Sequence, residues 1–537
     1  MVGKKATEIP SNVEEVTMRS VLFYLIVTSA VAGHIVSATT IAAAKFNLEE
    51  ATIADVHEAF KSGELTAKKL VEMYQKRIEA YDQKGPKLNI VIHLNPKALE
   101  EAAALDEKFK KSGPVGPLHG IPVLLKDNVN TKDMPTTGGS LSLKGYTPPY
   151  DATITKQLRD AGAIIIAKVN LHEFAVWGES VSSILGQTLN PYDLTRTPGG
   201  SSGGTGAGLA ANFGLLGIGT DTVNSIRSPA SANSIVGIRP TLGLVSRYGV
   251  IPYSFTQDVV GPMARTVTDA AKMLNVLTGF DPGDLATAWS VGNIQKDYTK
   301  YLKEDGLQGK RIGILRSFFG KDAIHEEVNA VTNEAIADCR RLGATIVELE
   351  TPDIDSGKIA DDISVHLYDL KPDLDSYLGD PKNNAPIKSL AEIIASGKYS
   401  PSIEKNIKDA EALTHDAKYD ARFVARMKLR DRVMALMAEK KLDALLFPHQ
   451  KRPVVPVGGT QVQRNGSLGS VTGFPSIVVP GGFTKPTETA KIGVPVGIEF
   501  LGRPWTEGLL IEIGYGYEQG TKNRRVPTTT PKLAEEM

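Results

Sequence analysis

Apolar residues follow two alternating patterns along the chain. Leu70, Val71, Tyr74 and Ile78 recur at the spacing of one helical face, whereas residues 121–125 form a short apolar run of the kind that makes a buried strand. The order of helix, glycine and β-branched strand returns in "TITKQLRDAGAIIIAKVN" and in "VNAVTNEAIADCRRLGATIVELE". Helices and strands that alternate in this way predict a layered α/β fold.

Further strands are predicted by "LDALLFP" and "FPSIVVPGGF", two apolar runs that end in proline or glycine. Before them, residues 363–441 have a mostly helical pattern that is interrupted by the polar stretch "LGDPKNNAPIKS". This segment predicts a helical insertion or cap on the α/β core.

The first 45 residues have the pattern of a leader. Arg19 precedes an uncharged apolar run over residues 21–33, and Val36-Ser37-Ala38 resembles the cleavage site of a secretory signal peptide. The run is shorter than the roughly 20 apolar residues that span a bilayer, although residues 35–44 extend it towards a weak anchor. We expect a cleaved signal peptide and a secreted protein, with attachment to a membrane through this leader as the alternative.

Three further features bear on secretion. Met18 stands directly before the leader pattern, so translation from Met1 and from Met18 are both open. Asn465-Gly466-Ser467 is a glycosylation sequon, which is compatible with secretion but also frequent by chance. The single cysteine, Cys339, cannot form an intrachain disulfide, so it indicates no redox compartment and is expected to be a small buried residue.

The charge balance excludes several classes of partner. Lys plus Arg and Asp plus Glu both number 61, so no overall field attracts nucleic acid or an acidic membrane surface. The sequence has neither an H-E-x-x-H motif nor a clustered Cys/His spacing. We therefore expect a small-molecule substrate in a pocket, with no nucleic acid, no metal and no cofactor.

The stretch "PGGSSGGTGAG" at residues 198–208 has six glycines around Ser201 and Ser202. Glycine is used where the backbone needs φ > 0 or where another group comes very close. The spacing fits neither a P-loop nor a dinucleotide-binding fingerprint. Residues 199–203 match the G-x-S-x-G nucleophile elbow, but a loop and not an apolar strand precedes them. By itself the stretch predicts only a tightly packed helix that begins near Thr205.

A second serine-bearing turn changes that interpretation. In "LLGIGTDTVNSIRSPA" an apolar strand ends at Thr220-Asp221 and a turn presents Ser225, while upstream "HGIPVLLKDNVNT" brings Lys126 to the end of a predicted strand. With these segments the chain resembles the amidase signature family. The segment "GGSSGGTGAGLAANFGLLGIGTDTVNSIRSPA" aligns in register with the glycine- and serine-rich core of that family, and the similarity runs from about residue 51 to the C-terminal region.

The resemblance implies a fold and a chemistry. The fold is a three-layer α/β/α domain with a mixed central sheet over residues 46–537, with the core signature at about residues 115–275. The chemistry is hydrolysis of amide C–N bonds through an acyl-enzyme, with Ser225 as the nucleophile, Ser201 as a bridging serine on a cis peptide bond and Lys126 as the base. Burial suits a lysine to this role because it favours the uncharged amine.

The resemblance also assigns supporting groups to the turn before the nucleophile. Its backbone N–H groups are expected to form an oxyanion hole, and they belong to Thr222, Val223, Asn224 and Ser225. Three further side chains are expected to hold the triad and the turn in shape, namely Ser202, Asp221 and Arg227.

The chain departs from the family in that same turn. Many members have two glycines where this chain has Val223 and Asn224. Because valine tolerates φ > 0 poorly, the departure predicts a narrower pocket near the scissile bond and leaves open whether the oxyanion hole is intact.

Several other residues are candidates for the site. His119 and His172 are each expected to pack or to lie in loops and not to take part in a Ser-His-Asp triad. The segment "EFAVWGES" predicts a helix, in which core packing is favoured over pocket lining for Trp177. A pocket for the acyl and amine groups is expected to draw on the cap and the C-terminal segment, with Phe447, His449, Phe474 and Trp505 as candidates.

Three alternatives to an active amidase stay open from the sequence. One is an inactive or binding-only homologue, and another is the glutaminase subunit of a tRNA-dependent amidotransferase. The third is an α/β hydrolase that uses Ser201 as its nucleophile. The sequence does not select among aliphatic amides, aryl amides, carbamates and peptide amides, and it leaves the oligomeric state open.

Overall fold

The computed structural model describes residues 46–534. The leader predicted over residues 1–45, with its signal-peptide and anchor interpretations, lies outside the described residues. Among the residues that are described, no helix combines the length and the apolar character that crossing a bilayer requires.

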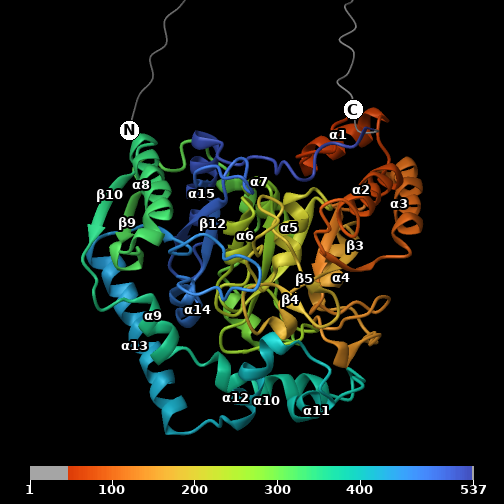
Figure 1. The fold of residues 1–537 in the computed structure, drawn as a ribbon. Coiled ribbons are helices and arrows are strands. Elements are labelled where there is room, and N and C mark those ends of the chain that lie inside the picture. Colours follow the sequence, from red (N-terminus) through yellow and green to blue (C-terminus); the bar gives the residue numbers. More distant parts are fainter. Residues whose placement is uncertain (1–45, 535–537) are drawn as a thin grey trace, which may run out of the picture. The chain divides into compact units, whose positions relative to one another are not determined.

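Eleven strands in the described chain form one sheet (Figure 1), in the order β1-β3-β2-β6-β8-β7-β12-β13-β11-β9-β10. Their bounds are β1 Val91–Leu94, β2 Pro122–Lys126, β3 Ile164–Val169, β6 Leu216–Asp221, β7 Val236–Arg239, β8 Val259–Ala264, β9 Arg311–Leu315, β10 Thr345–Leu349, β11 Ala444–Pro448, β12 Ser476–Phe483 and β13 Pro495–Leu501. A separate small hairpin consists of β4 Val181–Ser182 and β5 Gly186–Gln187.

The sheet is mixed. β2 pairs in parallel with β3 and β6, and β9 pairs in parallel with β10 and β11. The strands from β6 through β8, β7, β12 and β13 to β11 pair antiparallel, as β1 does with β3. The buried strands are nearly continuous apolar runs, as expected for strands covered on both faces.

Helices cover both faces of the sheet. α7, α8 and α15 form one group, in which α15 contacts both α7 and α8 and each helix contacts the sheet. α5 and α6 form another group, which packs against β2, β6, β12 and β13. The predicted three-layer α/β/α fold is therefore confirmed. The bounds are α1 Ile53–Ser62, α2 Ala67–Tyr81, α3 Ala98–Ser112, α4 Thr153–Asp160, α5 Gly203–Ala210, α6 Arg227–Ala232, α7 Val267–Leu277, α8 Glu326–Arg341, α9 Ser356–Lys358, α10 His366–Gly379, α11 Leu390–Ser396, α12 Glu404–Ala412, α13 Ala417–Glu439, α14 Ser467–Thr472 and α15 Glu507–Thr521.

Helices α10 to α13 lie within the segment that the sequence marked as mostly helical. α10, α11 and α12 pack together around one hydrophobic cluster, and Figure 1 shows them grouped away from α7 and α15. The same cluster includes Leu143, Phe174 and Ile251, which belong to loops of the α/β core. These helices are thereby tied to the loops that surround the candidate site.

One predicted helix is absent. In "EFAVWGES" only Glu173–Ala175 forms a short 3₁₀ turn, and Phe174 and Ala175 have positive φ angles of 50° and 60°. The carboxylate of Glu173 accepts hydrogen bonds from the backbone N–H groups of Ser183 and Ser400. These contacts to distant loops hold the segment in an irregular conformation against its local preference.

Candidate active site

Lys126 is the last residue of β2, where the sequence predicted it. Its side chain is fully buried, and its Nζ lies 2.7 Å from Ser201 Oγ and 2.8 Å from Thr220 Oγ1. Burial lowers the pKa of Lys126 to about 7, although the carboxylates of Asp221 and Asp258 act in the opposite direction. A lysine in this position is partly uncharged at neutral pH.

Ser201 lies in the loop that leads into α5, and the peptide bond between Gly200 and Ser201 is cis. The loop is fixed by its backbone, because Ser201 O accepts a hydrogen bond from the N–H of His172 at 3.0 Å. No strand runs into Ser201, so the nucleophile-elbow geometry of an α/β hydrolase is not present here.

The glycines of this stretch are explained by packing. A Cβ on Gly204 would lie 2.3 Å from the backbone oxygen of Asn170, and one on Gly208 would lie 2.6 Å from Leu124. Both distances are shorter than side-chain contacts allow, so α5 reaches this depth in the core only with glycine at these positions. The helix begins at Gly203, two residues before the position that the sequence predicted.

Ser225 lies in the turn between β6 and α6 and lines a cavity. Its backbone oxygen accepts a hydrogen bond from the N–H of Ser202 at 3.2 Å, so the serine-rich loop and this turn are directly joined. Ser202 Oγ also donates to Thr220 O at 3.2 Å. The structure thus brings Lys126, Ser201 and the Ser225 turn together at the end of neighbouring strands.

The Ser225 turn is held by buried ion pairs. Arg227 Nε lies 3.0 Å from Asp221 Oδ2, and Arg239 Nη1 lies 2.9 Å from Asp221 Oδ1. On its other side Arg227 Nη1 lies 2.6 Å from Glu499 of β13. Burial alone would raise the pKa of Asp221, but Arg227 and Arg239 hold it well below its usual range. Asp221 and Arg227 therefore form the contact expected of them.

The turn before Ser225 needs no glycine. Neither Val223 nor Asn224 has a positive φ, so the intolerance of valine for φ > 0 does not bear on this chain. Asn224 Oδ1 accepts a hydrogen bond from Gly466 N at 3.0 Å, which ties the turn to the start of α14. Within residues 46–534 no acceptor is found for the backbone N–H groups of Thr222, Val223, Asn224 and Ser225.

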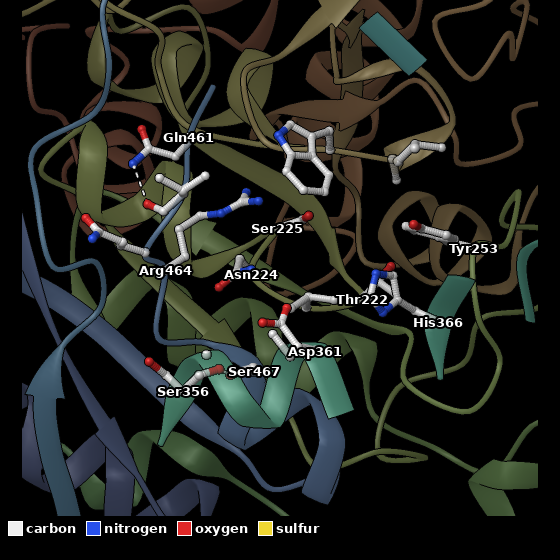
Figure 2. Close-up of a pocket in the computed structure, with 18 of the residues that line it drawn as sticks. Thr222, Asn224, Ser225, Tyr253, Ser356, Asp361, His366, Gln461, Arg464 and Ser467 are labelled. Atoms are coloured by element: carbon white, nitrogen blue, oxygen red, sulfur yellow. Dashed lines mark hydrogen bonds between the residues drawn. The ribbon is translucent and has the colours of Figure 1, made fainter. Parts of the chain in front are cut away.

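The cavity in front of Ser225 has a volume of about 410 Å³. Figure 2 shows Ser225, Asn224 and Arg464 on one side of it, with Tyr253 and His366 together on another. The lining residues come from five separate parts of the chain: Ala175, Val176, Trp177, Thr222, Val223, Asn224, Ser225, Tyr253, Ser356, Gly357, Ala360, Asp361, His366, Lys451, Gln461, Val462, Gln463, Arg464 and Ser467.

Some expectations for the pocket are wrong. Trp177 lines the cavity, whereas core packing was favoured for it. Phe447, His449 and Phe474 are buried among other side chains, and Trp505 packs against the core, so none of the four candidates lines this cavity. Apolar residues at strand ends face either the core or a pocket, and the sequence does not say which.

His119 and His172, the two histidines considered for a Ser-His-Asp triad, do not line the Ser225 cavity. His119 stacks on Phe109 with 5.3 Å between ring centroids, and His172 Nδ1 lies 3.3 Å from the carboxylate of Glu179. Burial lowers the pKa of His172 to about 3, so this ring is neutral at ordinary pH. In the described chain no group of three His, Cys, Asp or Glu side chains could hold a metal ion.

The glycosylation sequon is not accessible. Asn465 is fully buried, and its Nδ2 donates to Phe318 O at 2.8 Å and to Pro448 O at 2.7 Å. The folded protein therefore offers no acceptor at this position. Cys339 is buried and free, as expected.

Sequence reasoning missed two partners of Lys126 and of the turn. Thr220 Oγ1 accepts from Lys126 Nζ and, at 3.2 Å, from Asn128 Nδ2. Glu499, which pairs with Arg227, also lies 2.7 Å from His449 Nδ1. The position of Thr220 at the end of a predicted strand, next to Asp221, could have marked it as a site residue. Nothing in the sequence near Glu499 indicates that it pairs with Arg227.

Comparison with known proteins decides the family. The family model for Amidase matches residues 69–511. The chain belongs to the amidase signature family. A probable amidase of Arabidopsis thaliana is 36% identical over 507 residues, which cover 90% of this chain and 92% of that protein. The A-type polypeptide of the glutamyl-tRNA(Gln) amidotransferase of Alkaliphilus metalliredigens is 35% identical, and the match covers 88% of this chain and 96% of that protein.

Solved structures give the same result for this amidase family member. The native peptide amidase of Stenotrophomonas maltophilia superposes with a TM-score of 0.83 at 38% identity, covering 90% of this chain and 100% of that chain. The A-type polypeptide of the glutamyl-tRNA(Gln) amidotransferase of Thermotoga maritima has a TM-score of 0.69 at 26% identity, covering 90% of this chain and 98% of that chain. The protein is accordingly an amidase-type hydrolase by family.

Proposed function

We propose that the protein hydrolyses amide C–N bonds outside peptide chains, with Ser225 as nucleophile, Ser201 as bridging serine and Lys126 as base. The observation that carries the proposal is the fully buried lysine, whose pKa burial lowers to about 7, held 2.7 Å from a serine hydroxyl. The uncharged amine has one lone pair to accept the Ser201 proton, and an N–H remains to donate to Thr220.

In the proposed reaction Ser225 Oγ attacks the amide carbonyl carbon, and its proton passes through Ser201 to Lys126. The resulting oxyanion is held by the backbone N–H groups of residues 222–225, which lack acceptors within the described chain. The proton then returns through Ser201 to the leaving nitrogen, the C–N bond breaks and an acyl-enzyme remains. Water attacks the acyl-enzyme by the same route in reverse and releases the carboxylic acid.

The proposal is tested by labelling the protein with a fluorophosphonate and by assaying a panel of simple aryl amides, aliphatic amides and peptide amides. Peptide amides belong in the panel because of the similarity to the Stenotrophomonas maltophilia enzyme. We expect stoichiometric labelling and turnover, both lost in Ser225→Ala and Lys126→Met and both retained in Ser396→Ala, a serine of α11 outside the cavity. Folded protein that is neither labelled nor active would instead be an inactive homologue.

A second candidate is glutaminase activity, as in a tRNA-dependent amidotransferase. The similarity to the A-type polypeptides of several amidotransferases over most of the chain favours it. Release of ammonia from free glutamine, with no turnover of the aryl amides, would select this alternative.

We also propose that the N-terminal leader directs the protein to the secretory pathway and is cleaved, with membrane attachment as the alternative. The proposal is supported by the charged, apolar and small-residue order around residues 19–38. N-terminal sequencing of the protein recovered from the medium of an expressing cell checks it. A mature chain that still begins at Met1 or Met18 and stays inside the cell would contradict it.

A further inference from the structure

Among the described residues, Arg464 forms no ion pair in the cavity that Ser225 lines. Its side chain lines the cavity, and Figure 2 shows the guanidinium extending into it on the side where Ser225 lies. Within residues 46–534 its guanidinium makes neither a hydrogen bond nor an ion pair, and its contact is with the ring of Trp177, whose centroid lies 5.5 Å from Cζ. A guanidinium carries five N–H donors, so this one has its donors available for a ligand.

The position of this guanidinium is built into the fold. The next residue, Asn465, is fully buried and anchored by two side-chain hydrogen bonds. The backbone of residue 464 forms an isolated antiparallel β-bridge with Gln450. A Cβ on Gly178 would lie 1.7 Å from Arg464 Nη1, so the guanidinium rests on a backbone that only glycine leaves open. The backbone of residue 464 is therefore fixed beside the cavity, and its guanidinium lies against Gly178.

Glu179, whose field reaches Arg464, is held by a backbone contact. Its Oε1 accepts a hydrogen bond from the N–H of Gln461 at 2.6 Å. Burial lowers the pKa of Arg464, and the field of Glu179 only partly opposes this effect. Arg464 is half-buried, so its guanidinium is partly desolvated and still open to a ligand anion.

The other charges of the cavity do not neutralise Arg464. Lys451 adds a second cation, and Asp361, the single acid of the lining, is exposed to solvent. Burial lowers the pKa of His366 to about 4, so that ring is uncharged at neutral pH. The cavity thus has an excess of positive charge on the side of Arg464.

We propose that Arg464 binds a carboxylate of the substrate, so that the preferred substrates are amides that also carry a carboxylate group. The inference rests on the proposed function, because it assumes that Ser225 attacks an amide bound in this cavity. A planar guanidinium pairs with a carboxylate through two parallel hydrogen bonds, which orient the substrate as well as hold it. Arg464 is on this account a substrate-binding residue that sets specificity and takes no part in proton transfer.

The test uses pairs of 4-nitroanilides that differ only in charge. Succinyl, glutaryl and adipoyl 4-nitroanilides are each compared with the mate in which an isopropyl group replaces the carboxylate. A second set places the charge on the leaving group, with acetyl-4-carboxyanilide against acetyl-4-isopropylanilide. We expect at least one charged member to have a kcat/KM about 10- to 100-fold above its neutral mate, since groups built to bind a polar partner discriminate strongly against its absence.

Three variants connect this ratio to Arg464. Arg464→Met is expected to bring the ratio to about 1 while the neutral amides are still cleaved, and Arg464→Lys to keep part of it. Gly178→Ala is expected to act like Arg464→Met, because the added methyl displaces the guanidinium without removing its charge. Arg432→Met is the matched control, since Arg432 is an exposed residue of α13 that pairs with Asp353.

Binding gives a readout that does not require turnover. Glutarate is expected to slow fluorophosphonate labelling of Ser225 in the wild type and in Arg432→Met, but not in Arg464→Met. The inference is overturned if Ser225 is labelled and amides are cleaved, yet no charged member is preferred or the preference survives in Arg464→Met. If Ser225 is not labelled and no amide is cleaved, the proposed function fails first.

Discussion

At the scale of single residues, the environment of Lys126 decides what the site can do. A lysine at the end of a strand is ordinarily solvated and charged, whereas the apolar residues before it in "PVLLK" favour burial without showing which groups surround the amine. The structure places it out of water between two hydroxyls, at 2.7 Å and 2.8 Å. Desolvation then outweighs the two nearby carboxylates and lowers the pKa of Lys126 to about 7.

This pKa predicts the pH dependence of the reaction. The base must be uncharged, so kcat/KM is expected to fall as the pH drops below about 7 and to reach a plateau above it. The rate rises with pH because the base must lose its proton. The lowered pKa sets where this rise occurs, since the ordinary lysine value of 10.5 would place it above pH 9. A pH–rate profile between pH 5 and 11 checks the expectation, and a rise centred near pH 10 would contradict it.

A second residue-scale prediction concerns the oxyanion hole. Val223→Pro removes one backbone N–H from the turn and is expected to lower kcat by about 10²- to 10³-fold. Val223→Ala keeps the N–H, and since φ is not positive at this residue, it is expected to keep kcat within a few-fold of wild type. Steady-state kinetics on both variants decide the matter. Equal losses in the two variants would show that the side chain matters and not the N–H.

At the scale of elements, the glycines of α5 show how far a sequence pattern reaches. The pattern predicted a tightly packed helix near Ser201 and Ser202, and α5 is that helix. It could not predict what the helix packs against, because Asn170 follows β3 and Leu124 lies in β2. These neighbours become visible only when the strands are in register.

Gly204→Ala tests this packing. The added methyl would lie 2.3 Å from a backbone oxygen that cannot move aside, so we expect the free energy of unfolding to fall by about 1–3 kcal/mol or more. Because α5 begins next to the serines, kcat is expected to fall as well. The matched control is Gly379→Ala near the end of α10, where the nearest atom would be 3.7 Å away and stability is expected to stay within about 0.5 kcal/mol. Thermal or denaturant unfolding of both variants measures the difference.

At the scale of the whole molecule, ion pairs connect parts of the chain that are remote in sequence. Arg227 and Glu499 join the Ser225 turn to β13, and Glu50 joins the start of the described chain to Arg524, whose Nε lies 2.6 Å from the Glu50 carboxylate. Burial would raise the pKa of Glu50, but Arg524 and Arg265 outweigh it and lower the value to about 2. The second tie lies away from the site and so affects stability without touching the chemistry.

Glu50→Gln is therefore expected to reduce the free energy of unfolding at pH 7 by about 1–3 kcal/mol while kcat stays unchanged. A carboxylate whose pKa is lowered by folding contributes stability above its unfolded value near 4.5, and that contribution is lost as the pH falls through about 2. The gap between variant and wild type should accordingly close below pH 4.5. Glu58→Gln, at an exposed glutamate of α1, is the control, and a gap that persists at pH 2 would contradict the assignment.

The sequence by itself determined the α/β layers, the helix that carries Leu70, Val71, Tyr74 and Ile78, and the placement of Lys126 at the end of a strand. It did so because hydrophobic period, caps and glycine stops are local and act over a few residues. The resemblance to the amidase signature family added the roles proposed for Ser201 and Ser225, which no local pattern assigns.

Only the tertiary structure decided the rest. It made an irregular loop of the segment that holds Trp177, buried the sequon at Asn465, and set Glu499 against Arg227. It also left Arg464 unpaired in the cavity among the described residues. Burial, pairing and cavity shape depend on which distant segments meet, and the pKa of a side chain follows from those neighbours and not from its place in the chain.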